Sequence, residues 1–257
     1  MGRPREPLPT RVEETPNLPS VYDDTLDAGL SALGMSLSAA ARSAIDGQVR
    51  LLLAWTEAIN LTSIRDPGTV ALAHVVDSLT AVPILRERGV DRFIDLGSGG
   101  GYPGLPIAAA LPAARALLLE PIRKKVTFLS TVAAAAGLAD TVEAAPVRAE
   151  ALAADRRHRG QWPAVTARAV ASLGELVELA LPLLEPGGIL VAWKRGDLEA
   201  EWRGAERAMT ALGGTALERR PVEVPGLAGH CLVVATAGNG TPASYPRDPG
   251  VRRRRAW

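Results

Sequence analysis

The sequence predicts an α/β fold: a mostly parallel, doubly wound sheet that ends in an antiparallel hairpin and follows a small helical cap. Apolar runs of strand length alternate with longer segments in which apolar residues recur at helical spacing. This alternation is typical of parallel strands joined by right-handed helical crossovers. The last two apolar runs flank segment 225–229, whose proline and two glycines favour a hairpin.

The chain divides into three parts by composition. Residues 1–20 are rich in Pro, Arg, Glu and Thr, and we expect a disordered leader there. Residues 21–238 are expected to form one domain, with the helical cap over 21–88 and the core over 89–238. The tail, 239–257, carries Pro, Gly and four consecutive arginines, so we expect it to be disordered and to favour nucleic acid.

Each element of the domain has its own signal. Cap helices are expected over 22–33, 38–59 and 74–85. Core strands are expected at 93–96, 114–119, 142–145, 164–170 and 189–194, and the hairpin strands at 222–224 and 231–235. The core helices are expected at 105–111, 121–136, 173–184 and 197–212. In the third cap helix, His74 and Asp77 lie three residues apart and are expected to form a local hydrogen-bonded pair that can brace the following strand.

A glycine-rich turn after the first core strand organises the chain. Segment 95–104 reads DLGSGGGYPG, so glycine permits a tight turn and close approach of a nucleoside ligand. Its spacing fits both the D-x-G-x-G-x-G pattern of S-adenosylmethionine-dependent methyltransferases and the G-x-G-x-x-G pattern of dinucleotide enzymes. Glu120 ends the next strand, where a carboxylate can accept hydrogen bonds from a ribose. A glycine-rich turn with no ligand is the plainer alternative.

Composition limits the classes of protein. Length 257 suits one α/β domain with extensions, and the net charge of +1 says little about partners. Cys231 is the single cysteine and is expected in the core, which excludes an internal disulfide and a cysteine-based zinc site. The three histidines lack metal-ligand spacing, so no metal is expected. With no secretory signal and no apolar run of membrane-spanning length seen, we expect a soluble, cytoplasmic protein, taken as a monomer.

Charged residues mark the expected ligand edge. Arg123, Lys124 and Lys125 oppose the macrodipole at a helix start, so they are either a solvated face or contacts to phosphate. Arg168 and Lys194 end two further strands. Each is either half of a structural ion pair or a group in the ligand crevice, since the carboxyl ends of parallel strands line that crevice.

Several motifs together resemble one family. They are 60–67 (NLTSIRDP), 74–79 (HVVDSL), the turn 95–106, 124–129 (KKVTFL), 148–150 (RAE), 166–169 (TARA) and 245–247 (YPR). In this order they resemble the bacterial ribosomal RNA small subunit methyltransferase G family, also called glucose-inhibited division protein B, which methylates guanine N7 of 16S ribosomal RNA. The match runs from about residue 30 to 248, and segments 60–67 and 102–106 are its most specific parts.

The resemblance implies a Rossmann-like methyltransferase that binds S-adenosylmethionine. Together with the turn, it gives these cofactor residues: Gly97, Gly99, Gly101, Tyr102, Glu120, Ala149, Glu150 and Arg168. Glu120 stands where most members have Asp. Arg168 and Lys194 are expected to position the guanine, with no general base, because N7 already carries a lone pair. Arg123, Lys124 and Lys125 are expected to contact the ribosomal RNA or the small subunit.

Two other functions stay open from sequence alone. The Gly99, Gly101 and Gly104 spacing suits a nicotinamide-dependent oxidoreductase, although the chain shows no convincing catalytic dyad. A non-catalytic RNA-binding protein that kept the fold would rely on the basic segments. Binding of NAD without binding of S-adenosylmethionine would favour the oxidoreductase. RNA binding that weakens steeply with salt and does not depend on a cofactor would favour the non-catalytic protein.

Overall fold

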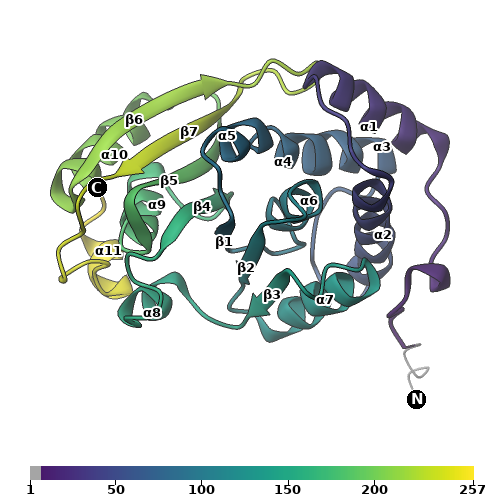
Figure 1. The fold of residues 1–257 in the computed structure, drawn as a ribbon, viewed down its shortest axis with the longest axis horizontal. Coiled ribbons are helices and arrows are strands. Elements are labelled where there is room, and N and C mark those ends of the chain that lie inside the picture. Colours follow the sequence, from purple (N-terminus) through teal and green to yellow (C-terminus); the bar gives the residue numbers. More distant parts are fainter. Residues whose placement is uncertain (1–6) are drawn as a thin grey trace.

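The computed structural model describes residues 7–257 and contains a seven-stranded sheet (Figure 1). Its strand order is β3-β2-β1-β4-β5-β7-β6. The strands are β1 (Arg92–Leu96), β2 (Arg115–Leu119), β3 (Val142–Ala145), β4 (Trp162–Arg168), β5 (Leu184–Arg195), β6 (Gly214–Pro221) and β7 (His230–Ala237). Strands β1 to β5 are parallel, and β7 pairs antiparallel with both β5 and β6. The predicted fold class is therefore confirmed.

The first hairpin strand lies earlier than the sequence suggested. We expected it at 222–224, but β6 spans Gly214–Pro221 and residues 222–229 form the connection to β7. Strand β6 is an edge strand whose charged residues Glu218, Arg219 and Arg220 interrupt any apolar run. Edge strands need little apolar surface, so their sequence signal is weak.

Helices cover both faces of the sheet. The core helices are α6 (Gly104–Ala110), α7 (Arg123–Ala135), α8 (Ala149–Ala154), α9 (Leu173–Ala180) and α10 (Glu199–Leu212). Alternate residues of each strand point to opposite faces. On β1, Phe93 packs toward α6, α7 and the cap, while Ile94 packs toward α8, α9 and α10. Cys231 is buried on this second face, as predicted.

The cap consists of α1 (Ser20–Ala32), α2 (Ala39–Thr56) and a nearly continuous helical run that leads into β1. That run comprises α3 (Pro67–Val70), the π-helical turn η2 (Ala71–Val76), α4 (Asp77–Leu79) and α5 (Val82–Glu87). By length and composition Pro67–Glu87 could cross a membrane, which the sequence analysis did not recognise. However, 72% of its most apolar window is buried inside the protein, so it is a core segment.

The described part of the expected leader is packed, in contrast to the predicted disorder. The short 3₁₀ turn η1 (Val12–Glu14) lies against α2, and Leu8, Val12 and Leu18 contact the core. The indole Nε1 of Trp55 donates to the carbonyl of Pro9 at 2.7 Å. These contacts join residues far apart in sequence, which composition does not reveal. The prediction for residues 1–6 lies outside the described residues.

The tail also differs from the expectation of disorder. Residues Pro249–Arg254 form α11, which lies beside α8 and α9 (Figure 1). Arg247 and Arg252 form ion pairs with carboxylates of the core, and Trp257 packs on the second face of the sheet. Acidic partners on α8 and α9 therefore convert a basic, proline-rich segment into a folded one.

Candidate functional site

The glycine turn connects β1 to α6 and is fixed to the neighbouring strand. The backbone N–H groups of Gly97 and Ser98 both donate to the carbonyl of Leu119, at 2.8 and 3.1 Å. The turn therefore lies at the carboxyl ends of β1 and β2, where ligands bind in sheets of this type.

The glycines of the turn have two different roles. A Cβ on Gly101 would lie 2.4 Å from Leu105 Cδ1, and one on Gly104 would lie 2.4 Å from Leu118 Cδ2. These two glycines therefore allow α6 and α2 to pack closely on the sheet. Gly99 instead faces open space, with its nearest neighbour the carbonyl of Gly97 at 3.8 Å. Gly99 thus leaves room for a ligand.

Asp95 holds the two ends of the turn together. Its Oδ2 accepts a hydrogen bond from the N–H of Gly104 at 3.2 Å, and its Oδ1 accepts from Thr166 Oγ1 at 2.8 Å. Its side chain is fully buried, and burial raises the pKa of this carboxyl to about 6. Asp95 therefore has a structural role, since it closes the loop without reaching solvent.

The carboxylate of Glu120, expected from sequence to bind a ribose, contacts the turn. Its Oε2 accepts from the N–H of Gly99 at 3.1 Å, and its Oε1 accepts from the N–H of Ile122 at 2.9 Å. Each carboxylate oxygen has a second lone pair, so both can still accept from ribose hydroxyls. The Glu120 side chain is thus held by two backbone donors.

Two exposed apolar side chains, which the sequence analysis missed, flank the turn. Among the described residues, the large hydrophobic side chains that are exposed are Val21, Ile122 and Val170, and the last two lie at this edge. Ile122 follows Glu120 by two residues, and Val170 reaches within 2.8 Å of a Cβ placed on Gly97. Apolar surface on both sides suits the faces of a purine base. The only sequence signal for Ile122 was its spacing from Glu120.

Ala149 and Glu150 lie at the start of α8, next to the end of β3. The sequence analysis named both as cofactor residues. Ala149 is buried, and the carboxylate of Glu150 pairs with Arg252 of α11. This ion pair directs the side chain toward the tail, so the backbone of these two residues is the part left to face a ligand.

Arg168 connects the sheet to the cap. Its Nη1 donates to Asp77 Oδ2 and to the carbonyl of Ala73, both at 3.0 Å. Asp77 is buried and also pairs with His230 Nδ1 at 3.0 Å. Because a buried cation requires an anionic partner, the structure favours the ion-pair interpretation of Arg168 over direct contact with a ligand. We had expected His74 and Asp77 to form a hydrogen-bonded pair. Instead, each of them contacts Arg168.

Tyr102 is buried beneath the turn. Its ring stacks on His74 with centroids 4.7 Å apart, and Arg168 lies 5.4 Å from its centroid. Burial raises the pKa of the Tyr102 hydroxyl. Burial and the adjacent Arg168 charge lower the pKa of His74 to about 4, so its imidazole is neutral at pH 7. Within the described chain the Tyr102 hydroxyl has no hydrogen-bond partner.

Lys194 is likewise engaged inside the protein. Its Nζ lies 2.6 Å from Glu201 Oε2 and donates to the carbonyl of Ala171 at 2.9 Å. The same Glu201 oxygen accepts from the N–H of Leu173 at 2.7 Å. Lys194 thus fixes loop 169–172, which carries Val170, and its side chain is not free to reach a base.

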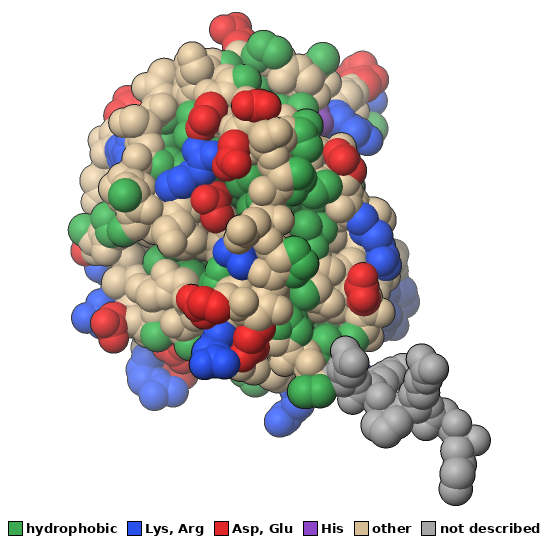
Figure 2. All heavy atoms as spheres, turned by 90° about the vertical axis from the view of Figure 1, so that its right-hand side faces the viewer, with side chains coloured by type: hydrophobic (Ala, Val, Ile, Leu, Met, Phe, Trp, Pro, Cys, Tyr) green, Lys and Arg blue, Asp and Glu red, His purple; other side chains and the backbone are tan. Residues whose placement is uncertain are grey.

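The expected RNA contacts remain open to solvent. Arg123 and Lys124 are exposed and Lys125 is half-buried at the start of α7, and none of the three forms an ion pair with another described residue. Lys124 also borders a groove of about 1490 Å³ between residues 7–19 and α2. That side of the molecule is shown in Figure 2, where apolar side chains form a band among charged groups of both signs. The groove lies apart from the glycine turn.

Metal chemistry has no candidate here: over residues 7–257, no three His, Cys, Asp or Glu side chains are grouped so that they could hold an ion.

The sheet order, the glycine turn and the acid on the next strand define the Rossmann-like fold of S-adenosylmethionine-dependent methyltransferases. Solved structures share the fold. An O-methyltransferase from Bacillus cereus, in complex with S-adenosylhomocysteine, is 16% identical with a TM-score of 0.53, over 75% of this chain and 91% of that one. The O-methyltransferase TomG from Streptomyces achromogenes is 20% identical with a TM-score of 0.51, over 79% and 92% of the two chains.

The family is given by closer relatives. The model of the rRNA small subunit methyltransferase G family matches residues 42–223. Ribosomal RNA small subunit methyltransferase G of Dehalococcoides mccartyi is 38% identical over 87% of this chain and 94% of that protein. The enzyme of the same name from Deinococcus radiodurans is 41% identical over 78% and 79%. The chain therefore belongs to the rRNA small subunit methyltransferase G family and is a methyltransferase. This membership sets aside the oxidoreductase alternative.

Proposed function

We propose that this protein transfers a methyl group from S-adenosylmethionine to N7 of a guanine in 16S ribosomal RNA. The observation that carries the proposal is Glu120, held against the open side of the glycine turn in a chain of this family. The protein would act in the cytoplasm, on free RNA or on the small subunit, and as a monomer.

The residues at the turn fit the cofactor. Gly99 leaves space for the ribose, and the Glu120 oxygens have free lone pairs toward it. Ile122 and Val170 offer apolar surface for the adenine, and the backbone at Ala149 and Glu150 can border its edge. The bound cofactor supplies an electrophilic methyl group on a sulfonium.

Little proton chemistry is required of the protein. Guanine N7 carries an in-plane lone pair, so no base must remove a proton before methyl transfer. Positioning of the acceptor in line with the methyl group can supply most of the rate enhancement. This matches a site whose buried acid, Asp95, and neutral imidazole, His74, are both engaged in holding structure.

Arg168 and Lys194 would support this positioning indirectly, through the backbone segments that they hold. Both side chains fix backbone at the site's edge: Arg168 the cap segment at Ala73, and Lys194 the loop at Ala171. We infer that they shape the guanine pocket through these segments. The exposed Arg123 and Lys124, with Lys125 beside them, would contact RNA phosphates, which is why their charges lie at a helix start without local compensation.

A methyl-transfer assay tests the proposal. Small subunits and free 16S RNA that lack the modification are incubated with the protein and methyl-labelled S-adenosylmethionine, and the RNA is digested to nucleosides. We expect label in N7-methylguanosine. Label in another nucleoside would overturn the assigned position, and binding of RNA with no transfer to either substrate would favour a non-catalytic RNA-binding protein.

A further inference from the structure

Helix α11 and the residue that follows it carry three arginine side chains without an acidic partner in the described chain. Arg253, Arg254 and Arg255 are exposed, and none forms an ion pair with another described residue. Cations in a last helical turn gain about 0.3–1 kcal/mol from the helix dipole, but three adjacent like charges also repel one another. Their placement at three consecutive positions at the end of α11 therefore has no sufficient structural reason.

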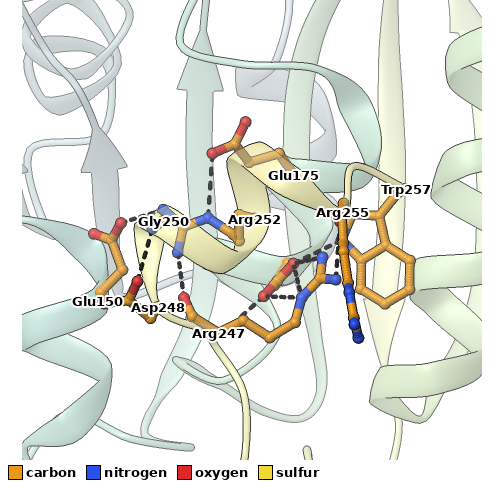
Figure 3. A network of polar contacts seen from close by, with 9 residues as sticks. Glu150, Glu175, Arg247, Asp248, Gly250, Arg252, Arg255 and Trp257 are labelled. Atoms are coloured by element: carbon orange, nitrogen blue, oxygen red, sulfur yellow. Dashed lines mark hydrogen bonds and ion pairs between the residues drawn. The ribbon is translucent and has the colours of Figure 1, made fainter.

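The same helix is held firmly by its other arginines. Arg252 is 8% exposed and pairs with Glu150 and Glu175, the latter at 3.2 Å (Figure 3). Arg247 pairs with the buried Glu178 at 2.6 Å. A helix of this length is not stable alone in water. These buried ion pairs therefore set its position and orientation.

Trp257 fixes the segment that follows α11 to the core. Its Nε1 donates to Glu178 at 2.7 Å, and the guanidinium of Arg247 stacks on its ring at 4.4 Å. A Cβ on Gly174 would lie 2.6 Å from Trp257 Cβ, so glycine at this position lets the residue dock on α9. Chain on both sides of the three exposed arginines is thus fixed to the core.

The attachment places the arginines beside the cofactor edge. Glu150, the partner of Arg252, is the second residue of α8, which follows β3 where the carboxyl ends of the strands meet the ligand. Arg148, immediately before α8, is exposed as well. The cap side in Figure 2, by contrast, mixes acidic and basic groups. On the α8 side the four exposed arginines, Arg148, Arg253, Arg254 and Arg255, outnumber the exposed Asp248 of the same segment, so a polyanion that approaches from there meets a surplus of positive charge.

We propose that α11 is an RNA-docking element, in which Arg253, Arg254 and Arg255 contact phosphates of the ribosomal RNA substrate while Arg247 and Arg252 anchor the helix. The inference rests on the proposed function and extends its RNA surface from α7 to the opposite side of the cofactor edge. Guanidinium groups suit phosphate because they donate two parallel hydrogen bonds.

The salt dependence of RNA binding tests the proposal. The variant Arg253→Gln/Arg254→Gln/Arg255→Gln is compared with wild type by titrating 16S RNA at several salt concentrations. Each lost phosphate contact makes the negative slope of log K against log salt shallower by about 0.7–0.9, so we expect the magnitude of the slope to decrease by about 2–3 for three contacts. Affinity near 0.15 M salt should fall at least about tenfold, with S-adenosylmethionine affinity and Tm unchanged.

A matched control separates local contact from net charge. Arg88→Gln/Arg115→Gln/Arg207→Gln removes the same charge from exposed arginines, two of which lie at the amino ends of the strands. We expect the control to keep most of the wild-type slope. Equal slopes for wild type and the α11 variant would overturn the inference, as would a defect seen with small subunits but absent with free RNA, which would indicate a protein contact. If wild type methylates RNA, such results leave the proposed function standing.

Discussion

At the scale of single residues, Glu120 and Lys124 lie close in sequence but serve different surfaces. Glu120 is buried and held by the backbone of the turn, whereas Lys124 is exposed at the start of α7. The division assigns the cofactor to one residue and the RNA to the other, and it can be tested by comparing substitutions.

Glu120→Ala should weaken S-adenosylmethionine binding by about tenfold or more, because hydrogen bonds to a charged acceptor contribute about 1.5–3 kcal/mol. Lys124→Ala should leave cofactor affinity unchanged and raise the KM for RNA. Calorimetry with the cofactor and steady-state methyl transfer measure the two effects. Equal loss of cofactor affinity in both variants would contradict the division of roles.

His74 should make stability depend on pH. Its pKa is lowered from 6.5 to about 4, so between these values the unfolded state binds more protons than the folded state. The contribution of His74 to the free energy of unfolding is therefore fully present above pH 6.5 and is lost as the pH falls toward 4. The loss should be on the order of 2 kcal/mol.

Urea unfolding of wild type and His74→Gln at pH 7 and pH 4.5 measures this effect. Asp95, whose raised pKa acts in the opposite direction over the same range, is present in both proteins, so their difference isolates His74. We expect wild type to lose more stability than the variant on acidification. An identical loss would show that the imidazole is not held neutral.

At the scale of elements, the glycine turn combines packing and binding in one short segment. Gly101 packs against α6 and α2, and Gly99 faces open space. Both have positive φ, +92° and +54°, so alanine is strained at each. Because Gly101 is crowded by side chains and Gly99 is not, alanine at the two positions is expected to affect different properties: stability at Gly101 and cofactor affinity at Gly99.

Gly101→Ala should destabilise the fold by about 2 kcal/mol or more, because strain adds to overpacking against Leu105. Gly99→Ala should cost about 1 kcal/mol and mainly reduce cofactor affinity, because its methyl group takes ligand space. Thermal unfolding and cofactor titration distinguish them. A Gly99 variant with unchanged cofactor affinity would mean that the ligand does not pass over this residue.

Elements differed in how well the sequence predicted them. Strands β1, β2 and β4 and the second half of β5 are largely buried and form nearly continuous apolar runs, so these runs located them. The edge strand β6 has few apolar residues, and the six-residue α8 is too short to show a helical period. The turn and Glu120 were predicted, since spacing alone defines them. The exposure of Ile122 and Val170, and the partner of Arg168, depend on tertiary contacts that spacing does not give.

At the scale of the whole molecule, Asp77 joins three parts of the fold. Its carboxylate pairs with Arg168 of β4 and His230 of β7, and its carbonyl accepts from Trp193 Nε1 of β5 at 2.7 Å. The cap therefore meets the sheet through a buried charged network as well as through apolar packing.

Asp77→Asn should destabilise the protein by about 3–5 kcal/mol, because it leaves Arg168 buried without a charge partner. Asp91→Asn, which removes an exposed partner of Arg92, is the control and should change stability by about 0.5 kcal/mol or less. Denaturant unfolding at pH 7 measures both. A small effect at Asp77 would mean that the cap is held by packing alone.

The anchoring of α11 has a consequence for synthesis of the chain. Arg247 follows Glu178 by 69 residues, and Arg252 follows Glu150 by 102. These acids are therefore synthesised well before the arginines that pair with them. Until segment 247–252 has left the ribosome, a nascent chain carries the carboxylates of Glu150 and Glu178 without these cationic partners.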